Sequence, residues 1–133
     1  MKRVLFICTH NSARSQMAEG LVNEYHSKRW IAHSAGTKPT TVHPLAIKAM
    51  AELGIDISSH HSKALNDFKG DTFDLVVTVC DDASETCPFF PAENIIHRGF
   101  PDPAKAKGSE EERMDEFRRT RDDIKVWLDT VLR

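Results

Sequence analysis

Residues 3–15 read Arg3-Val4-Leu5-Phe6-Ile7-Cys8-Thr9-His10-Asn11-Ser12-Ala13-Arg14-Ser15. The apolar run before the cysteine has no polar alternation, which is typical of a strand buried on both faces of a parallel sheet. From residue 13 to about residue 28, apolar residues return at the spacing of one helical face. The stretch therefore predicts a buried strand, a short loop that begins at Cys8, and an amphipathic helix.

The rest of the chain repeats this alternation. Apolar runs predict strands at residues 30–34, 73–79 and 94–96, and helical stripes predict helices at residues 43–53 and 109–133. The last helix opens with a capping box, in which Ser109 is followed by Glu112. Alternating strands and helices form βαβ units with right-handed crossovers. We expect one α/β domain over residues 1–133, with a four-stranded, mainly parallel sheet and helices on both faces.

The composition and charge of the chain argue against some partners and some cellular locations. The chain has 133 residues, 40% of them hydrophobic, and a formal net charge of −2, so it lacks the basic field that attracts nucleic acid. The run from Val4 to Ile7 is shorter than the roughly 7 to 15 apolar residues of a secretory signal, and no later run reaches the roughly 18 of a membrane span. We expect a cytoplasmic monomer that binds neither nucleic acid nor membrane.

The loop carries the strongest chemical signal, because five residues separate Cys8 from Arg14 between a strand and a helix. Such a loop turns its backbone N–H groups inward, and Arg14 adds a planar fork, so an oxyanion can bind and the Cys8 thiolate is favoured. The loop has no glycine, and Asn11 is the residue best suited to a left-handed backbone. The predicted binding residues are Thr9, His10, Asn11, Ser12, Ala13, Arg14 and Ser15.

A plainer interpretation makes Cys8 a buried strand-end thiol and Arg14 a surface residue of the first helical turn. The position of the pair between a buried strand and an amphipathic helix favours the anion site. A nucleotide-binding P-loop is excluded, because the Gly-x4-Gly-Lys pattern is absent.

The chain has three cysteines, an odd number that argues against a structural disulfide framework. If the strands at 3–8 and 73–79 are neighbours, Cys8 and Cys80 at their carboxyl ends come close enough for a disulfide. Cys87 is expected to start outside the pocket, so residues 81–86 would have to rearrange. The plainer alternatives are a buried strand-end thiol for Cys80 and an incidental loop thiol for Cys87. Their spacing and the lack of paired histidines argue against zinc, and we expect no metal or cofactor.

The chain resembles the thioredoxin-coupled, phosphatase-like arsenate reductases over essentially its whole length. The resemblance rests on Cys8 to Ser15 together with Gln16-Met17-Ala18-Glu19-Gly20, Ser34-Ala35-Gly36, Gly54-Ile55-Asp56-Ile57-Ser58 and Asp102-Pro103. It implies the low-molecular-weight tyrosine-phosphatase fold, with Cys8 as nucleophile, Arg14 binding arsenate and Asp102 as proton donor. It also implies a Cys8–Cys80 disulfide that passes to Cys80–Cys87 and is reduced by thioredoxin.

Some relatives bind potassium through residues that match Asn11, Glu19 and Ser34, plus a carboxylate where this chain has Lys63. A lysine at that position opposes a cation, so the resemblance does not lead us to expect a metal.

Two other functions remain open from the sequence. A low-molecular-weight tyrosine phosphatase would need only Cys8, Arg14 and Asp102, although Ala104 stands where phosphatases usually carry an aromatic residue. An oxyanion-binding module would hold phosphate or sulfate without turnover. Glutathione or mycothiol as electron donor, residual phosphatase activity and the extent of rearrangement in residues 81–86 also stay open.

Overall fold

The computed structural model describes residues 1–81 and 90–132. Its strands and α-helices follow the expected order, and two 3-10 helices, η1 (Leu65–Phe68) and η2 (Pro103–Lys105), lie between them. The first helix ends at Tyr25 rather than near residue 28, because residues 26–29 turn back into the second strand through a bond from Arg29 N to His26 O of 3.1 Å. The larger elements are β1 (Lys2–Cys8), α1 (Arg14–Tyr25), β2 (Trp30–Gly36), α2 (Pro44–Ala51), β3 (Leu75–Thr78), β4 (Ile95–His97) and α3 (Glu110–Val131).

The sheet has the strand order β2-β1-β3-β4, and each neighbouring pair is parallel. The chain therefore reverses its direction of travel across the sheet between β1 and β3, the type of position where α/β sheets bind ligands. Ile7 pairs with Thr78, and Val79 N donates to Ile7 O at 2.9 Å. The prediction that these two strands are neighbours is confirmed. Cys8 and Cys80 consequently leave the sheet at the same edge.

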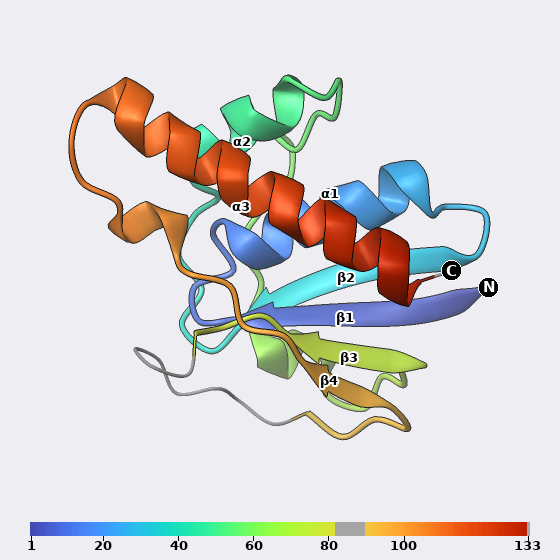
Figure 1. The fold of residues 1–133 in the computed structure, drawn as a ribbon. Helices are drawn as coiled ribbons and strands as arrows, with labels where there is room; N and C mark the ends of the chain where they lie inside the picture. Colours follow the sequence, from blue (N-terminus) through green and yellow to red (C-terminus); the bar gives the residue numbers. More distant parts are fainter. Residues whose placement is uncertain (82–89, 133) are drawn as a thin grey trace.

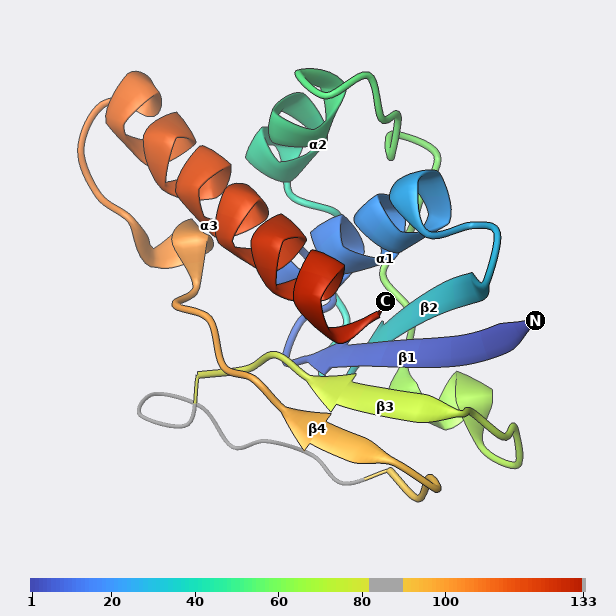
Figure 2. The ribbon, with the colours of Figure 1, turned by 45° about the vertical axis from the view of Figure 1, so that its right-hand side comes forward.

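The three α-helices all cover one face of the sheet (Figures 1 and 2). Val4 and Phe6 point into the larger core beneath them, whereas Leu5 and Ile7 point to the other face. That second face is covered by η1 and by loops that carry Phe73 and Phe90. Helices thus lie on both faces as expected, but the second face has a short 3-10 helix instead of an α-helix.

The buried strand β1 explains why the sequence pattern there was continuous. Its residues from Val4 to Ile7 have no exposed surface, because both faces of the sheet are covered at this point. Burying a side chain of this size stabilises the fold by roughly 1.5–3 kcal/mol. β1 therefore forms a rigid support directly before the Cys8 loop.

The ends of α2 and α3 follow the expected local signals. Pro44 is the first residue of α2, and Gly54 just beyond its end has a φ of 76°. The capping box of α3 is confirmed, since Ser109 Oγ accepts from Glu112 N at 3.1 Å. The two helices are joined by Glu52, whose carboxylate contacts Arg121 Nη1 at 2.8 Å and Arg118 Nη2 at 2.9 Å.

We predict that Glu52→Gln lowers the free energy of unfolding at pH 7 by about 1 kcal/mol or less, because the carboxylate is partly exposed. Hydrogen bonds from Arg118 and Arg121 hold the pKa of Glu52 below its ordinary value. The stabilisation is therefore fully present above the unfolded pKa, near 4.5, and is lost as the pH falls through the lower folded value. Urea unfolding at pH 7 and pH 3 measures the difference.

Glu116→Gln is the matched control, because Glu116 makes only an exposed pair with Arg119 at 2.9 Å. It should have a smaller effect than Glu52→Gln at pH 7. A loss that is equal for the two variants, or that grows as the pH falls, would contradict the assignment.

Candidate functional site

The carbonyl groups of the Cys8 loop accept hydrogen bonds from residues outside the loop. Lys38 N donates to Thr9 O at 2.9 Å, Thr40 N to His10 O at 3.2 Å, and His43 N to Ser12 O at 3.0 Å. These donors belong to residues 38–43, which follow β2 and which we call the strap. A peptide whose carbonyl points outward presents its N–H on the opposite side. The strap therefore fixes a loop whose N–H groups can converge on an anion.

Side chains complete this outer support. Asn11 O accepts from Ser62 Oγ at 2.7 Å and from Gln16 Nε2 at 3.2 Å. His10 lies at the exposed side of the loop, and its Nδ1 is 3.0 Å from Lys38 O. Because a carbonyl only accepts, this ring nitrogen carries the proton. The loop is thus tied to the strap by side-chain as well as backbone bonds.

Two residues allow the loop to turn this tightly. Asn11 has a φ of 50°, which confirms the prediction that it takes the left-handed conformation. Gly36, at the end of β2, lies directly under the loop: a β-carbon there would be 2.5 Å from Thr9 O and 2.8 Å from Asn11 N. Real side chains do not approach backbone atoms this closely. Glycine is therefore required at position 36 for the loop to rest on the sheet.

A chain of hydrogen bonds leads to the sulfur of Cys8. Asn11 Oδ1 accepts from Lys63 N at 2.9 Å, so its Nδ2 faces Ser15 Oγ, at 2.8 Å. Since Ser15 Oγ accepts that bond, its own hydrogen is available to Cys8 Sγ, 2.8 Å away. A hydroxyl that donates to sulfur favours the thiolate form. Cys8 is a free thiol and is buried, with 2% of its surface exposed.

Arg14, the first residue of α1, has 2% of its surface exposed and carries its charge into the site. Its Nη1 donates to Phe100 O at 3.1 Å, and its Nη2 lies 3.6 Å from Asp102 Oδ2. The second distance describes an ion pair without a close hydrogen bond. A guanidinium in this position can bind two oxygens of an anion in the loop.

Asp102 is held at the edge of the same site. It caps η2, where its Oδ1 accepts from Ala104 N at 3.0 Å, and its Oδ2 faces Arg14. The structure therefore brings together Cys8, Arg14 and Asp102, although 87 residues separate the last two. No side chain among the described residues caps α1, and its first turn has no acidic residue, so the positive end of its dipole is not offset there.

A buried carboxylate lies behind the loop. Glu19 Oε1 accepts from Ser34 Oγ at 2.8 Å and lies 3.6 Å from Lys63 Nζ. Its Oε2 is 3.3 Å from His60 Nδ1. Lys63 therefore places its ammonium group beside the carboxylate of Glu19. In residues 1–81 and 90–132, no cluster of three or more His, Cys, Asp or Glu side chains could hold a metal ion.

Cys80 follows β3 and is fully buried. It is disulfide-bonded, whereas Cys8 is a free thiol. Cys87 and most of the 81–86 segment lie outside the described residues, so the predictions on their position and rearrangement are not tested. Within the part of the chain that the structure describes, no helix is long and apolar enough to cross a membrane.

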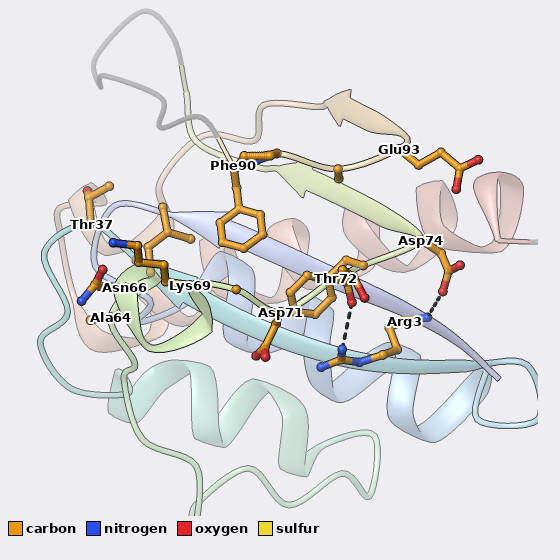
Figure 3. Close-up of a pocket in the computed structure, with 16 residues that line it drawn as sticks. Arg3, Thr37, Ala64, Asn66, Lys69, Asp71, Thr72, Asp74, Phe90 and Glu93 are labelled. Carbon is orange, nitrogen blue, oxygen red and sulfur yellow. Dashed lines mark hydrogen bonds between the residues drawn. The ribbon is translucent and has the colours of Figure 1, made fainter.

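A separate groove of about 1080 Å³ lies on the second face of the sheet, and Phe73 and Phe90 are among the residues that line it (Figure 3). One end is fixed by Arg3, which donates from its backbone to Asp74 at 2.7 Å and from its guanidinium to Thr72 O at 2.8 Å. The described lining contains no cysteine, histidine or serine. The groove is far larger than an oxyanion needs, and Cys8, Arg14 and Asp102 do not line it.

Sequence reasoning missed the strap and Gln16. Gln16 is completely buried, and its Nε2 donates to Asn11 Oδ1 at 2.9 Å and to His61 O at 3.0 Å. A glutamine on the buried side of a predicted helix was the available signal for its role. His43, which begins α2, had no such signal. Partial burial and Arg113 lower the pKa of His43, and its neutral ring accepts from Leu45 N at 3.1 Å.

Residues 3–132 match the family model described as low molecular weight phosphotyrosine protein phosphatase. The chain is 47% identical to the arsenate reductase of Halalkalibacterium halodurans over 124 residues, which are 92% of this chain and 89% of that protein. It is 46% identical to the arsenate reductase of Bacillus subtilis over the same number of residues, 124, with the same coverage.

Arsenate reductases are also among the solved structures of similar fold. An arsenate reductase in its phosphate-binding state has a TM-score of 0.83 and 31% identity, covering 99% of this chain and 97% of that one. A thioredoxin-dependent arsenate reductase from Corynebacterium glutamicum has a TM-score of 0.67 and 28% identity, with 99% of this chain and 63% of that one covered.

The low-molecular-weight protein tyrosine phosphatase of T. tengcongensis has a TM-score of 0.73 and 25% identity, covering 99% of this chain and 98% of that one. The model match over nearly the whole length, the parallel sheet and the Cys8 loop agree. The chain belongs to the low-molecular-weight phosphotyrosine protein phosphatase family.

Proposed function

We propose that this protein reduces arsenate to arsenite through a relay of Cys8, Cys80 and Cys87. The observation that carries the proposal is the adjacency of β1 and β3, which leads Cys8 and Cys80 out of the sheet at one edge. Phosphate transfer needs only the first of these thiols. The curated relatives named arsenate reductases support the same choice within the family.

In the first step, the Cys8 thiolate attacks the arsenic of an arsenate ion that the loop and Arg14 hold. An oxygen of arsenate leaves as water after Asp102 supplies a proton. The hydrogen bond from Ser15 and the positive end of α1 favour the attacking thiolate. The loop N–H groups are oriented before the substrate arrives, so little reorganisation is required.

In the second step, the Cys80 thiolate attacks Cys8 Sγ. The sulfur–arsenic bond breaks, its electron pair stays on arsenic, and arsenite leaves. Two thiols become one disulfide, which accounts for the two electrons that reduce As(V) to As(III). Cys87 then attacks Cys80 and frees Cys8. A free Cys8 together with a disulfide-bonded Cys80 is the thiol distribution that this sequence of steps predicts at its end.

Thioredoxin is the proposed reductant of the final disulfide. The similar protein from Corynebacterium glutamicum is named thioredoxin-dependent, which supports this choice. Arsenate is the substrate, and phosphate and sulfate are its tetrahedral analogues. We also propose that the protein acts in the cytoplasm as a monomer and needs no metal or cofactor.

Phosphatase activity is the competing function, because the family model carries that description. It would use Cys8, Arg14 and Asp102 alone. The aromatic residue that grips an aryl ring is replaced by Ala104, which lies in η2 two residues after the capping aspartate. We therefore expect hydrolysis of aryl phosphates to be slow relative to arsenate reduction.

We predict that arsenate-dependent NADPH oxidation with thioredoxin and thioredoxin reductase is lost in Cys8→Ser, Cys80→Ser and Cys87→Ser alike. Each thiol forms a bond that the next step needs. Assays with glutathione or mycothiol in place of thioredoxin test the donor. The reductase assignment fails if the natural chain hydrolyses an aryl phosphate, only Cys8→Ser is inactive, and arsenate drives no oxidation. Saturable phosphate binding without either activity would instead support a binding module.

Ser15→Ala should slow alkylation of Cys8 at neutral pH by about tenfold, because a hydrogen bond to a charged group contributes roughly 1.5–3 kcal/mol. The measurement uses iodoacetamide with Cys80→Ser and Cys87→Ser also present. Ser62→Ala is the control, since Ser62 Oγ bonds Asn11 O and not the sulfur. Equal rates in Ser15→Ala and Ser62→Ala would remove Ser15 from this role.

Gly36→Ala should weaken phosphate binding about tenfold or more, since overpacking against backbone costs roughly 1–3 kcal/mol. Titration calorimetry with phosphate measures the change. Gly54→Ala is the control: its β-carbon meets nothing within 4 Å, but its φ of 76° strains any side chain. It should lower stability and leave phosphate affinity unchanged. If both variants bind phosphate as the natural chain does, Gly36 does not shape the loop.

A further inference from the structure

Buried contacts connect the Cys8 loop with Cys80 through the segment that precedes Asp102. Arg14 Nη1 donates to Phe100 O at 3.1 Å, and Phe100 N donates to Val79 O, also at 3.1 Å. Val79 is the residue directly before Cys80. Arg14 and Phe100 each have 2% of their surface exposed, and Cys80 has none. One peptide segment thus touches the anion-binding arginine at its carbonyl and the end of β3 at its amide.

Gly99 of the same segment packs directly against the backbone of Cys80. A β-carbon on Gly99 would lie 2.9 Å from Cys80 O and 3.7 Å from Asp81 Cα. The backbones of residues 99 and 80 are therefore in direct contact, and no side chain fits between them. The φ of Gly99 is not in the left-handed region, so the backbone angle does not require glycine here. The close packing against Cys80 is what requires it.

Phe100 is anchored so that a movement at its carbonyl cannot be absorbed by its side chain. Its ring packs against Trp127 of α3, with ring centroids 6.3 Å apart. The guanidinium of Arg98 lies 4.3 Å from the same ring. With the ring packed against α3, a movement of the Phe100 carbonyl is expected to pass into the backbone of residues 99–101.

We propose that the segment Gly99-Phe100 is a positioning element that makes the reactivity of Cys80 depend on occupancy of the Cys8 loop. The proposal rests on the function proposed above and adds that binding of the oxyanion precedes the reaction of Cys80. Cys80 is held while the loop has no oxyanion and is released when an oxyanion is bound. The resolving thiol then becomes reactive when its target on Cys8 is loaded.

The physical basis is competition for one guanidinium. An oxyanion in the loop attracts the Arg14 donors that Phe100 O and Asp102 use. A buried carbonyl that loses its donor is costly, so the Phe100–Pro101 peptide, which carries this oxygen, is expected to rotate toward another partner and to shift the backbone of Phe100 and Gly99 with it. This rotation removes the contact of Gly99 with Cys80. The coupling is thus carried by an element that both sites contact, as a coupling free energy requires.

The test uses the full chain with Cys8→Ser and Cys87→Ser, so that Cys80 is the only thiol. Inorganic phosphate is the probe, ionic strength is matched with chloride, and the alkylation rate of reduced Cys80 by iodoacetamide is measured. We expect saturating phosphate to accelerate alkylation about fivefold or more, the lower end of typical coupling. The negative charge of phosphate, acting alone, would disfavour a nearby thiolate and would therefore slow the alkylation of Cys80. An unchanged or slower rate at saturation overturns the proposal.

Gly99→Ala in the same background is the uncoupling variant. The added methyl group pushes the segment away from Cys80 O, so alkylation should be fast without phosphate and should no longer respond to it. Phosphate affinity should rise, because Phe100 O then competes less for the Arg14 donors and the coupling is reciprocal. Gly54→Ala, which strains a distant turn, should keep the phosphate response. If Gly99→Ala responds as Gly54→Ala does, Gly99 does not transmit occupancy.

A turnover assay separates this inference from the proposed function. With all three thiols present, Gly99→Ala should keep kcat for arsenate within about twofold, because saturating arsenate also releases Cys80 in the natural chain, whereas KM should fall. If the natural chain reduces arsenate but Cys80 ignores phosphate, the coupling fails and the function stands. If Cys80 responds to phosphate but arsenate drives no oxidation, the function fails and the release of Cys80 by an oxyanion stands.

Discussion

The outward hydrogen bonding of the Cys8 loop is the constraint on which the rest of the site depends. Each carbonyl from Thr9 to Ser12 accepts a bond from outside the loop, so the N–H groups of the loop are committed to the inner side. A loop organised in this way pays no reorganisation cost when an oxyanion arrives. It also explains why position 36 has no side chain, because the loop lies directly on Gly36.

The order of the strands in the sheet determines where Cys80 lies. Because β3 adds to the free side of β1 instead of to β2, the chain reverses at β1, and both strands end beside the loop. The segment between β4 and η2 then passes over the same edge and brings Phe100 and Asp102 to Arg14. Three separate parts of the chain therefore meet at one end of the sheet. Substrate binding, proton supply and redox chemistry are proposed for residues that share this edge.

Much of the fold was predictable because its signals are local. The apolar run in β1, the Pro44 start of α2 and the Ser109 capping box each depend on residues within a few positions. The second face of the sheet was harder to predict. Leu65 and Phe68 in η1, together with Phe73 and Phe90, cover it without any helical periodicity. A short 3-10 helix has no repeating apolar stripe that a sequence pattern can reveal.

The sequence by itself determined the kind of chemistry: Cys8 and Arg14 at the two ends of one loop, between a strand and a helix, predict an oxyanion site, and Asn11 was the residue able to turn it. Only the tertiary structure decided how that loop is held and what it contacts. The strap and Gln16 hold the loop, and Phe100 O reaches Arg14, through backbone groups and buried contacts between distant segments. Such contacts leave little trace in the sequence, because any residue can supply a backbone N–H or carbonyl, and only folding determines which of them meet.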